Sequence, residues 1–181
     1  MRKVIAAFNM TLDGNCDHTA GIPDEELHRH YEELLKSADI ALYGRTTYHL
    51  MEFWKDLVQN PSGQKDMDDF ALSMDRIPKL VFSRTLKEVD WHSARLAQHE
   101  LGEEVRLLKE QPGGDILVGS RSLITSLINL GLVDEFQLTI FPVVAGKGLT
   151  LLDAIADRTL LKLTKTKTFT SGAVTMYYTF E

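Results

Sequence analysis

Residues 113–148 decide how this chain folds, and they read GGDILVGSRSLITSLINLGLVDEFQLTIFPVVAGKG. The short apolar run at 116–118 is typical of a buried strand. After a small-residue turn, apolar residues recur at helical spacing as far as Leu130. Gly131 suits the end of that helix, because glycine adopts the left-handed conformation without steric cost. The segment therefore predicts a strand that passes through a turn directly into a helix.

The turn that opens this helix has the composition of an anion site. The free N–H groups and the dipole of a helix N-terminus favour negative charge. Beside Gly119, Ser120 and Ser122 offer hydroxyl donors and Arg121 offers a positive charge. We expect a phosphate group there. The alternative is an ordinary turn in which a serine caps the helix.

Two earlier turns share these residue types. A strand predicted at 40–43 is followed directly by a helix, and a strand predicted at 80–82 is followed by a turn. The residues that follow are Gly44, Arg45, Thr46 and Thr47 after the first strand and Ser83, Arg84 and Thr85 after the second. Ligands of open α/β sheets bind at the carboxyl ends of the strands. The turns together therefore predict a site for a phosphorylated ligand.

The rest of the chain predicts a mainly parallel α/β sheet that is finished by antiparallel strands. A continuous apolar run at 4–8 indicates a central strand, and a helix is expected from Pro23. Towards the C-terminus, apolar and polar residues alternate, which is typical of half-buried strands. These segments are 136–140, 161–163 and 174–180, with an expected hairpin turn at Ser171-Gly172. Nothing divides the chain, so residues 1–181 are expected to form a single domain.

Apolar spacing also predicts two further helices. The one at 94–110 is weakened near Gly102 and follows a short strand expected at 89–91. The other opens after Gly44 and carries an apolar stripe along one face. The stripe consists of Leu50, Phe53, Trp54 and Leu57.

Composition limits the classes of function. The chain has 181 residues, of which 44% are hydrophobic and 25% charged, as in ordinary globular domains. A net charge of -6 without a long basic run argues against nucleic acid as a partner. No apolar stretch is long enough for a membrane span or a secretory segment, so the cytoplasm is the expected location. Cys16 is the only cysteine, which excludes an intrachain disulfide.

The sequence offers neither a metal site nor a nucleophilic triad. His28 and His30 are two residues apart and diverge on a helix, whereas metal-binding pairs lie four apart. All six histidines are therefore interpreted as surface or capping residues, and no metal is expected. No serine lies in a nucleophile elbow, and the P-loop and Rossmann fingerprints are incomplete.

Six short segments, in order, make the chain resemble the dihydrofolate reductase-like superfamily. They are MTLDG at 10–14, GRTTY at 44–48, VFSRTL at 81–86, GGDILVGS at 113–120, LVDE at 132–135 and PVVAGKG at 142–148. The chain is most similar to stand-alone relatives of the reductase domain of the bifunctional riboflavin-biosynthesis deaminase/reductase. The deaminase half is absent, because the chain has no H-x-E motif and no cysteine pair.

This resemblance implies a dihydrofolate reductase-like three-layer fold, NADPH as cofactor and a homodimer. Residues 44–47 match the first phosphate-binding turn, and residues 119–122 match the pyrophosphate turn. Residues 83–85 match the segment near the adenosine and its 2′-phosphate. The turns that the residues themselves single out thus coincide with the cofactor positions that the resemblance implies.

The expected activity is hydride transfer from NADPH to a small pterin- or pyrimidine-like heterocycle. Such a reaction uses an acid, and the candidates are Asp13, in the Leu-Asp-Gly segment, and Glu26, early in the first helix. Asp13 has the alternative role of a turn former. Two other functions stay open: a nucleotide-binding module without turnover, and the 5-amino-6-(5-phosphoribosylamino)uracil reductase of riboflavin biosynthesis.

Overall fold

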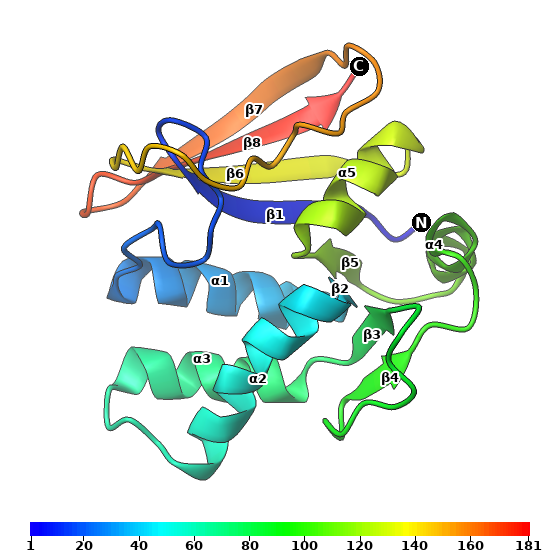
Figure 1. Ribbon diagram of the computed structural model, residues 1–181, viewed down its shortest axis with the longest axis horizontal. Helices are drawn as coiled ribbons and strands as arrows, with labels where there is room; N and C mark the ends of the chain where they lie inside the picture. Colours follow the sequence, from blue (N-terminus) through cyan, green and yellow to red (C-terminus); the bar gives the residue numbers. More distant parts are fainter.

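The computed structural model describes residues 1–181. It contains a single sheet of eight strands, to which both the first and the last part of the chain contribute. The strands are β1 (Val4–Thr11), β2 (Ala38–Gly44), β3 (Lys79–Phe82), β4 (Ala94–Leu96), β5 (Asp115–Val118), β6 (Glu135–Phe141), β7 (Leu161–Thr168) and β8 (Val174–Phe180). The helices are α1 (Glu25–Ser37), α2 (Arg45–Gln59), α3 (Lys65–Arg76), α4 (Leu101–Glu110) and α5 (Arg121–Asn129). The order of strands across the sheet is β4-β3-β2-β5-β1-β6-β8-β7 (Figure 1).

The strand directions confirm the predicted sheet. The strands from β4 to β6 in that order run parallel, and β8 runs antiparallel to both β6 and β7. Gly172 has a φ of 85° in the turn between β7 and β8, and Gly131 has a φ of 63° after α5. Both glycines therefore adopt the conformation that only glycine takes readily. None of the helices combines the length and the hydropathy that a membrane span requires.

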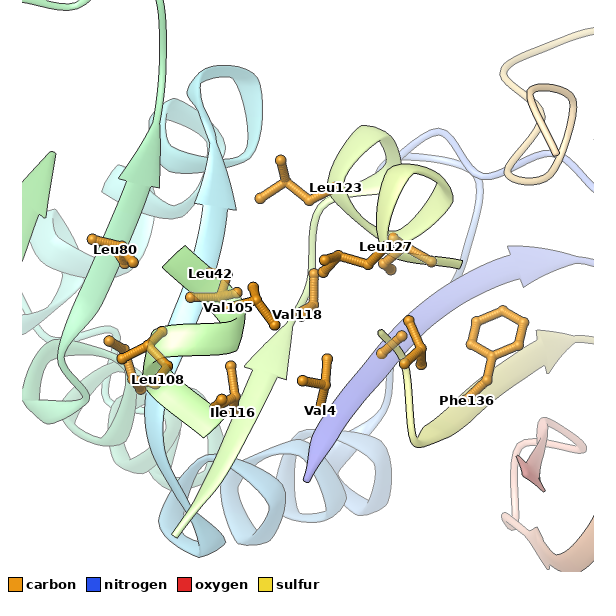
Figure 2. Packing of buried hydrophobic residues seen from close by; sticks show 14 of the residues in the cluster. Val4, Leu42, Leu80, Val105, Leu108, Ile116, Val118, Leu123, Leu127 and Phe136 are labelled. Atoms are coloured by element: carbon orange, nitrogen blue, oxygen red, sulfur yellow. The ribbon is translucent and has the colours of Figure 1, made fainter. Parts of the chain in front are cut away.

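Helices cover both faces of the sheet, which gives the three layers that the resemblance implied. Successive side chains of β1 point to opposite faces, so Val4 and Ala6 join the core beneath α4 and α5. Ile5 and Ala7 join the core beneath α1, α2 and α3. Figure 2 shows the first of these cores, in which α4 and α5 pack over β2, β5 and β1.

The start of α1 is fixed by a side-chain cap. The carboxylate of Asp24 accepts a hydrogen bond from the N–H of Leu27 at 2.8 Å, so the helix begins at Glu25. This is two residues after the predicted start at Pro23. Proline does not extend the helix here but precedes its cap.

The predicted helix at 94–110 is wrong in its first part. Ala94–Leu96 forms the edge strand β4, and α4 begins only at Leu101. Pairing with β3 decides this, since Lys79 lies opposite Ala94 in the parallel register. The strand expected at 89–91 is absent, and Trp91 is instead buried, with Nε1 donating to Asp75 Oδ1 at 2.6 Å.

His30 is buried, which contradicts the interpretation of every histidine as a surface or capping residue. The residue is 7% exposed, and its ring packs against those of Tyr31, Phe169 and Tyr177. Its Nε2 has no hydrogen-bond partner. Removal from water, with a smaller effect of Lys167, lowers the pKa of His30 to about 4. The buried imidazole is therefore neutral at neutral pH.

We expect His30 to make the fold sensitive to acid. The pKa of His30 is about 4 in the folded state against an ordinary value of 6.5, so the unfolded state binds more protons between these values. Its contribution to stability is present above about pH 6.5 and is lost as the pH falls towards 4. Thermal unfolding at about pH 7 and about pH 5 should show a drop in Tm that is several degrees smaller in His30→Phe.

The matched control is His99→Gln, which removes an exposed histidine and should keep the pH dependence of the wild type. Equal drops in Tm for the wild type and His30→Phe would show that His30 does not cause the acid sensitivity.

Candidate functional site

A cavity of about 1360 Å³ opens at the carboxyl ends of β1, β2, β3 and β5. All the cofactor residues expected from the sequence line it, except Ser120. They are Gly44, Arg45, Thr46, Thr47, Ser83, Arg84, Thr85, Gly119, Arg121 and Ser122. The fold thus brings the three separate turns to one cavity.

Hydrogen bonds between the turns fix their relative positions. The N–H of Gly44 donates to Ser120 Oγ at 2.8 Å and joins the start of α2 to the start of α5. Arg45 Nη1 donates to Thr85 Oγ1 at 2.8 Å and joins α2 to the turn after β3. That turn is shaped in part by Ser83 Oγ, which accepts from the N–H of Thr85 at 3.2 Å.

Two of the helices that begin at the cavity, α2 and α5, have open N-termini. The carboxylate of Asp24 caps α1, whereas no side chain caps the first N–H groups of α2 or α5. Ser120 occupies the N-cap position of α5, but it is buried and its hydroxyl accepts from Gly44 instead. An ordinary serine cap is therefore excluded. The unpaired N–H groups and the dipoles of α2 and α5 give this end of the cavity a positive potential.

The three arginines of the turns differ in how far their charge is engaged. Arg121 Nη1 donates to the carbonyl of Thr150 at 2.9 Å and lies 3.5 Å from Asp153 Oδ1, which partly neutralises it. Arg45 is bonded only to a neutral hydroxyl. Arg84 is exposed and makes neither a hydrogen bond nor an ion pair. Arg84 is therefore the cation most available to a ligand.

The apolar stripe of α2 is only partly buried, and three of its four residues lie towards the cavity. Leu50 is 37% exposed and Phe53 is 53% exposed, and both line the cavity together with Trp54. Tyr48 is the only buried residue of α2. Helical spacing identifies an apolar face but does not say whether protein or a ligand covers it.

Asp13 ties two loops together and does not line the cavity. Its Oδ2 accepts from the N–H of Gly146 at 2.7 Å, and its Oδ1 accepts from the N–H of Ala145 at 3.1 Å and from the hydroxyl of Thr11. These hydrogen bonds, with that of Thr11 the strongest, lower the pKa of Asp13 to about 2. The geometry favours the turn-forming role over that of an acid.

Glu26 also has a structural partner and lies outside the lining of the cavity. Its Oε2 accepts from the N–H of Thr170 at 2.8 Å and from the hydroxyl of Thr170 at 2.6 Å. The pair fastens α1 to the hairpin of β7 and β8 and lowers the pKa of Glu26. Neither acid expected from the sequence therefore reaches a ligand in the cavity.

A titratable pair that the sequence did not reveal lies at the edge of the cavity. His28 of α1 lines it, and His28 Nδ1 is 2.7 Å from Asp66 Oδ2 of α3. The ring of Trp54 packs edge-on against the imidazole. Nε2 has no partner in the protein and is not among the buried unpartnered atoms, so it is accessible. The two residues are 38 positions apart, and no spacing rule relates them.

Comparison with known sequences identifies the family. The model of the RibD C-terminal domain matches residues 2–175. The uncharacterized protein YyaP of Bacillus subtilis (strain 168) is 38% identical over 183 positions, which cover 98% of this chain and 94% of YyaP. The uncharacterized protein YwjB of the same organism is 25% identical, with 98% of this chain and 97% of YwjB covered.

Solved structures show the same fold at low sequence identity. A putative riboflavin biosynthesis protein from Shewanella sp. PV-4 matches with a TM-score of 0.75 and 17% identity, over 99% of each chain. The diaminohydroxyphosphoribosylaminopyrimidine deaminase/5-amino-6-(5-phosphoribosylamino)uracil reductase of Thermotoga maritima matches with a TM-score of 0.71 and 15% identity. That match covers 99% of this chain and 57% of the Thermotoga chain. The fold and the sequence match agree, and the chain belongs to the RibD C-terminal domain family.

Proposed function

We propose that this chain is an NADPH-dependent reductase that transfers hydride to a small heterocyclic substrate. One observation carries the proposal: α2 and α5 begin at one cavity with open N-termini, joined by the hydrogen bond from Gly44 to Ser120. Two adjacent anion sites suit the pyrophosphate of a dinucleotide, and the unpaired Arg84 suits an additional phosphate. Membership of the RibD C-terminal domain family supports this choice.

The cavity residues fit such a cofactor. The first N–H groups of α2 and α5, with the hydroxyls of Thr46 and Ser122, would hold the phosphates. When bound, NADPH supplies a hydride from its nicotinamide ring. The apolar side chains of Leu50 and Trp54 would exclude water from the reacting groups.

Reduction of a carbonyl or imine also requires a proton at the acceptor atom, and we assign this step to His28. Its accessible Nε2 can give a proton to a ligand in the cavity, while Asp66 holds the ring through Nδ1. Asp13 and Glu26 are left out of this role, because their carboxylates are occupied outside the cavity. The protein is proposed to act in the cytoplasm, as a homodimer, on a small molecule.

The experiments that test this function also distinguish it from two alternatives. The name of the Thermotoga relative suggests that the substrate is 5-amino-6-(5-phosphoribosylamino)uracil. The second alternative is a module that binds the nucleotide without turnover. A thermal-shift screen with NADPH, NADH, flavins, folates and pyrimidine phosphates identifies the bound class, since a ligand of the native state raises Tm. Oxidation of NADPH with the acceptors that bind then separates an enzyme from a binding module.

The first prediction concerns the unpaired arginine. Arg84→Ala should weaken NADPH by roughly tenfold or more and leave NADH almost unchanged, because the lost charge would pair with the 2′-phosphate. Titration calorimetry with both nucleotides measures the effect. Arg158→Ala, which removes an exposed arginine outside the cavity, is the control. Equal weakening of both cofactors would remove Arg84 from this role.

The second prediction concerns the start of α5. A Cβ atom at Gly119 would meet only the ring of Tyr43, at 3.5 Å, so the fold tolerates a side chain there. Gly119→Val should nevertheless block the close approach of a pyrophosphate and abolish NADPH binding, whereas Gly119→Ala should reduce it. Circular dichroism checks folding and calorimetry checks binding. Normal NADPH affinity in a folded Gly119→Val variant would put the cofactor elsewhere.

The third prediction concerns the proton. His28→Gln should keep the affinity for NADPH and lower the rate of hydride transfer by roughly 10²-fold, because the proton donor is lost. Single-turnover NADPH oxidation with the acceptor found in the screen measures the rate. His99→Gln is the matched control, since His99 also pairs with a carboxylate, that of Glu103, but lies outside the cavity. An unchanged rate of hydride transfer in His28→Gln would show that a group other than His28 donates the proton.

A further inference from the structure

Four side chains form a line of hydrogen bonds from the interior of the sheet to the cavity. Thr175 of β8 and Thr139 of β6 are buried, with their hydroxyl oxygens 2.7 Å apart. The hydroxyl of Tyr31 lies 3.2 Å from Thr139 Oγ1 and donates to Asn9 Oδ1. Tyr31 and Asn9 both line the cavity, so the line ends at its wall.

Counting protons fixes the direction of this line. A hydroxyl has one proton, and that of Tyr31 goes to Asn9 Oδ1. Thr139 must therefore donate to Tyr31, and Thr175 must donate to Thr139. Burial raises the pKa of Tyr31 to about 12, so its hydroxyl keeps its proton throughout the neutral range.

The amide of Asn9 is consequently held with its nitrogen free. Oδ1 is occupied by Tyr31, and Nδ2 has no acceptor in the protein. Nδ2 is also not among the buried atoms that lack a partner, so it is accessible. Because Asn9 lines the cavity, its two N–H donors are available to a ligand there.

Several residues that line the cavity with Asn9 offer a ligand no free donor. Ala7 and Leu27 are apolar, and the hydroxyl of Tyr43 already donates to the sulfur of Met74 at 3.2 Å. A ligand that contacts Ala7, Leu27 and Asn9 therefore meets apolar surface and the amide donors of Asn9. A ligand that leaves those donors without an acceptor loses the hydration of the amide without compensation.

We propose that Asn9 determines specificity by donating from Nδ2 to a ring carbonyl oxygen, so that the substrate is a heterocycle with a carbonyl rather than an amino group at that position. The inference rests on the proposed function in that it places the substrate of the reductase in this cavity. Tyr31, Thr139 and Thr175 are positioning residues, since they act through Asn9.

Two commercial pteridines test the proposal, because they differ in the hydrogen-bonding character of the same ring positions. Lumazine carries carbonyl groups where 2,4-diaminopteridine carries amino groups. The wild type should bind lumazine roughly tenfold to a hundredfold more tightly, because only lumazine offers an acceptor to Asn9. Titration calorimetry on the full chain, with NADP⁺ present and absent, measures both affinities.

The decisive variant is Asn9→Asp, which keeps the shape of the side chain and replaces its donors by an acceptor. It should reverse the preference, so that 2,4-diaminopteridine binds better than lumazine. Asn9→Leu should bind both compounds with similar affinity. A variant that melts like the wild type yet keeps the wild-type preference would overturn the proposal, and so would a wild type that binds neither compound or prefers the diamine.

Tyr31→Phe tests the positioning line without changing Asn9. The phenylalanine keeps the ring and removes the hydroxyl that occupies Asn9 Oδ1, so the amide can turn either way. The preference for lumazine should fall to roughly threefold or less, while Tm changes little. An unchanged preference would separate Asn9 from the line of hydroxyls and overturn that part of the proposal.

These measurements also separate this inference from the proposed function. Binding of the two pteridines does not require turnover of NADPH. If NADPH is never oxidised but the preference reverses in Asn9→Asp, the role of Asn9 stands and the reductase activity fails. If NADPH binds and reacts but the preference does not reverse, the assignment of Asn9 fails alone.

Discussion

The hydrogen bond from the N–H of Gly44 to the hydroxyl of Ser120 is the contact on which the cavity depends. A serine at a helix N-cap usually satisfies the N–H groups of its own helix. Ser120 instead accepts from the residue that precedes α2, and its own helix starts without a side-chain cap. Ser120 is buried, so water does not compete for its hydroxyl. The result is two helix ends held together, each with unsatisfied donors at the same opening.

Asp13 and Glu26, the two acids that the sequence analysis proposed for the site, have structural roles outside the cavity. Asp13 joins the loop after β1 to residues 145 and 146, and Glu26 joins α1 to the hairpin of β7 and β8. Both contacts are made to backbone N–H groups at turns, where an ionised acceptor is most effective. Neither of these carboxylates lines the cavity, and the chemistry there is proposed to depend on His28, on the open helix ends and on a bound cofactor.

The parts of the fold that sequence predicted are those that depend on neighbours in the chain. The turn at 119–122 follows an apolar run and precedes a helical stripe, and such local order identifies a strand, a turn and a helix. The alternation at 174–180 likewise predicted β8. The prediction of a helix failed at 94–96. A three-residue strand at the sheet edge forms because it pairs with β3, which is distant in the sequence.

The parts of the candidate site that sequence missed are contacts between distant residues. The Leu-Asp-Gly segment predicted that Asp13 follows the first strand. It did not predict that the N–H of Gly146 would donate to the carboxylate of Asp13. The approach of Asp66 to His28 depends on how α3 packs against α1, and the line from Thr175 to Asn9 depends on the register of β6 and β8. Residue spacing contains none of this information.

The apolar face of α2 has a thermodynamic consequence. Folding normally removes such a face from water, but Leu50 and Phe53 stay exposed on the cavity wall. The free energy gained by removing these side chains from water is thus not gained when the chain folds. It is gained only when a ligand covers the cavity wall. Association should therefore carry a negative change in heat capacity, which is the signature of apolar burial, even where phosphate contacts dominate the enthalpy.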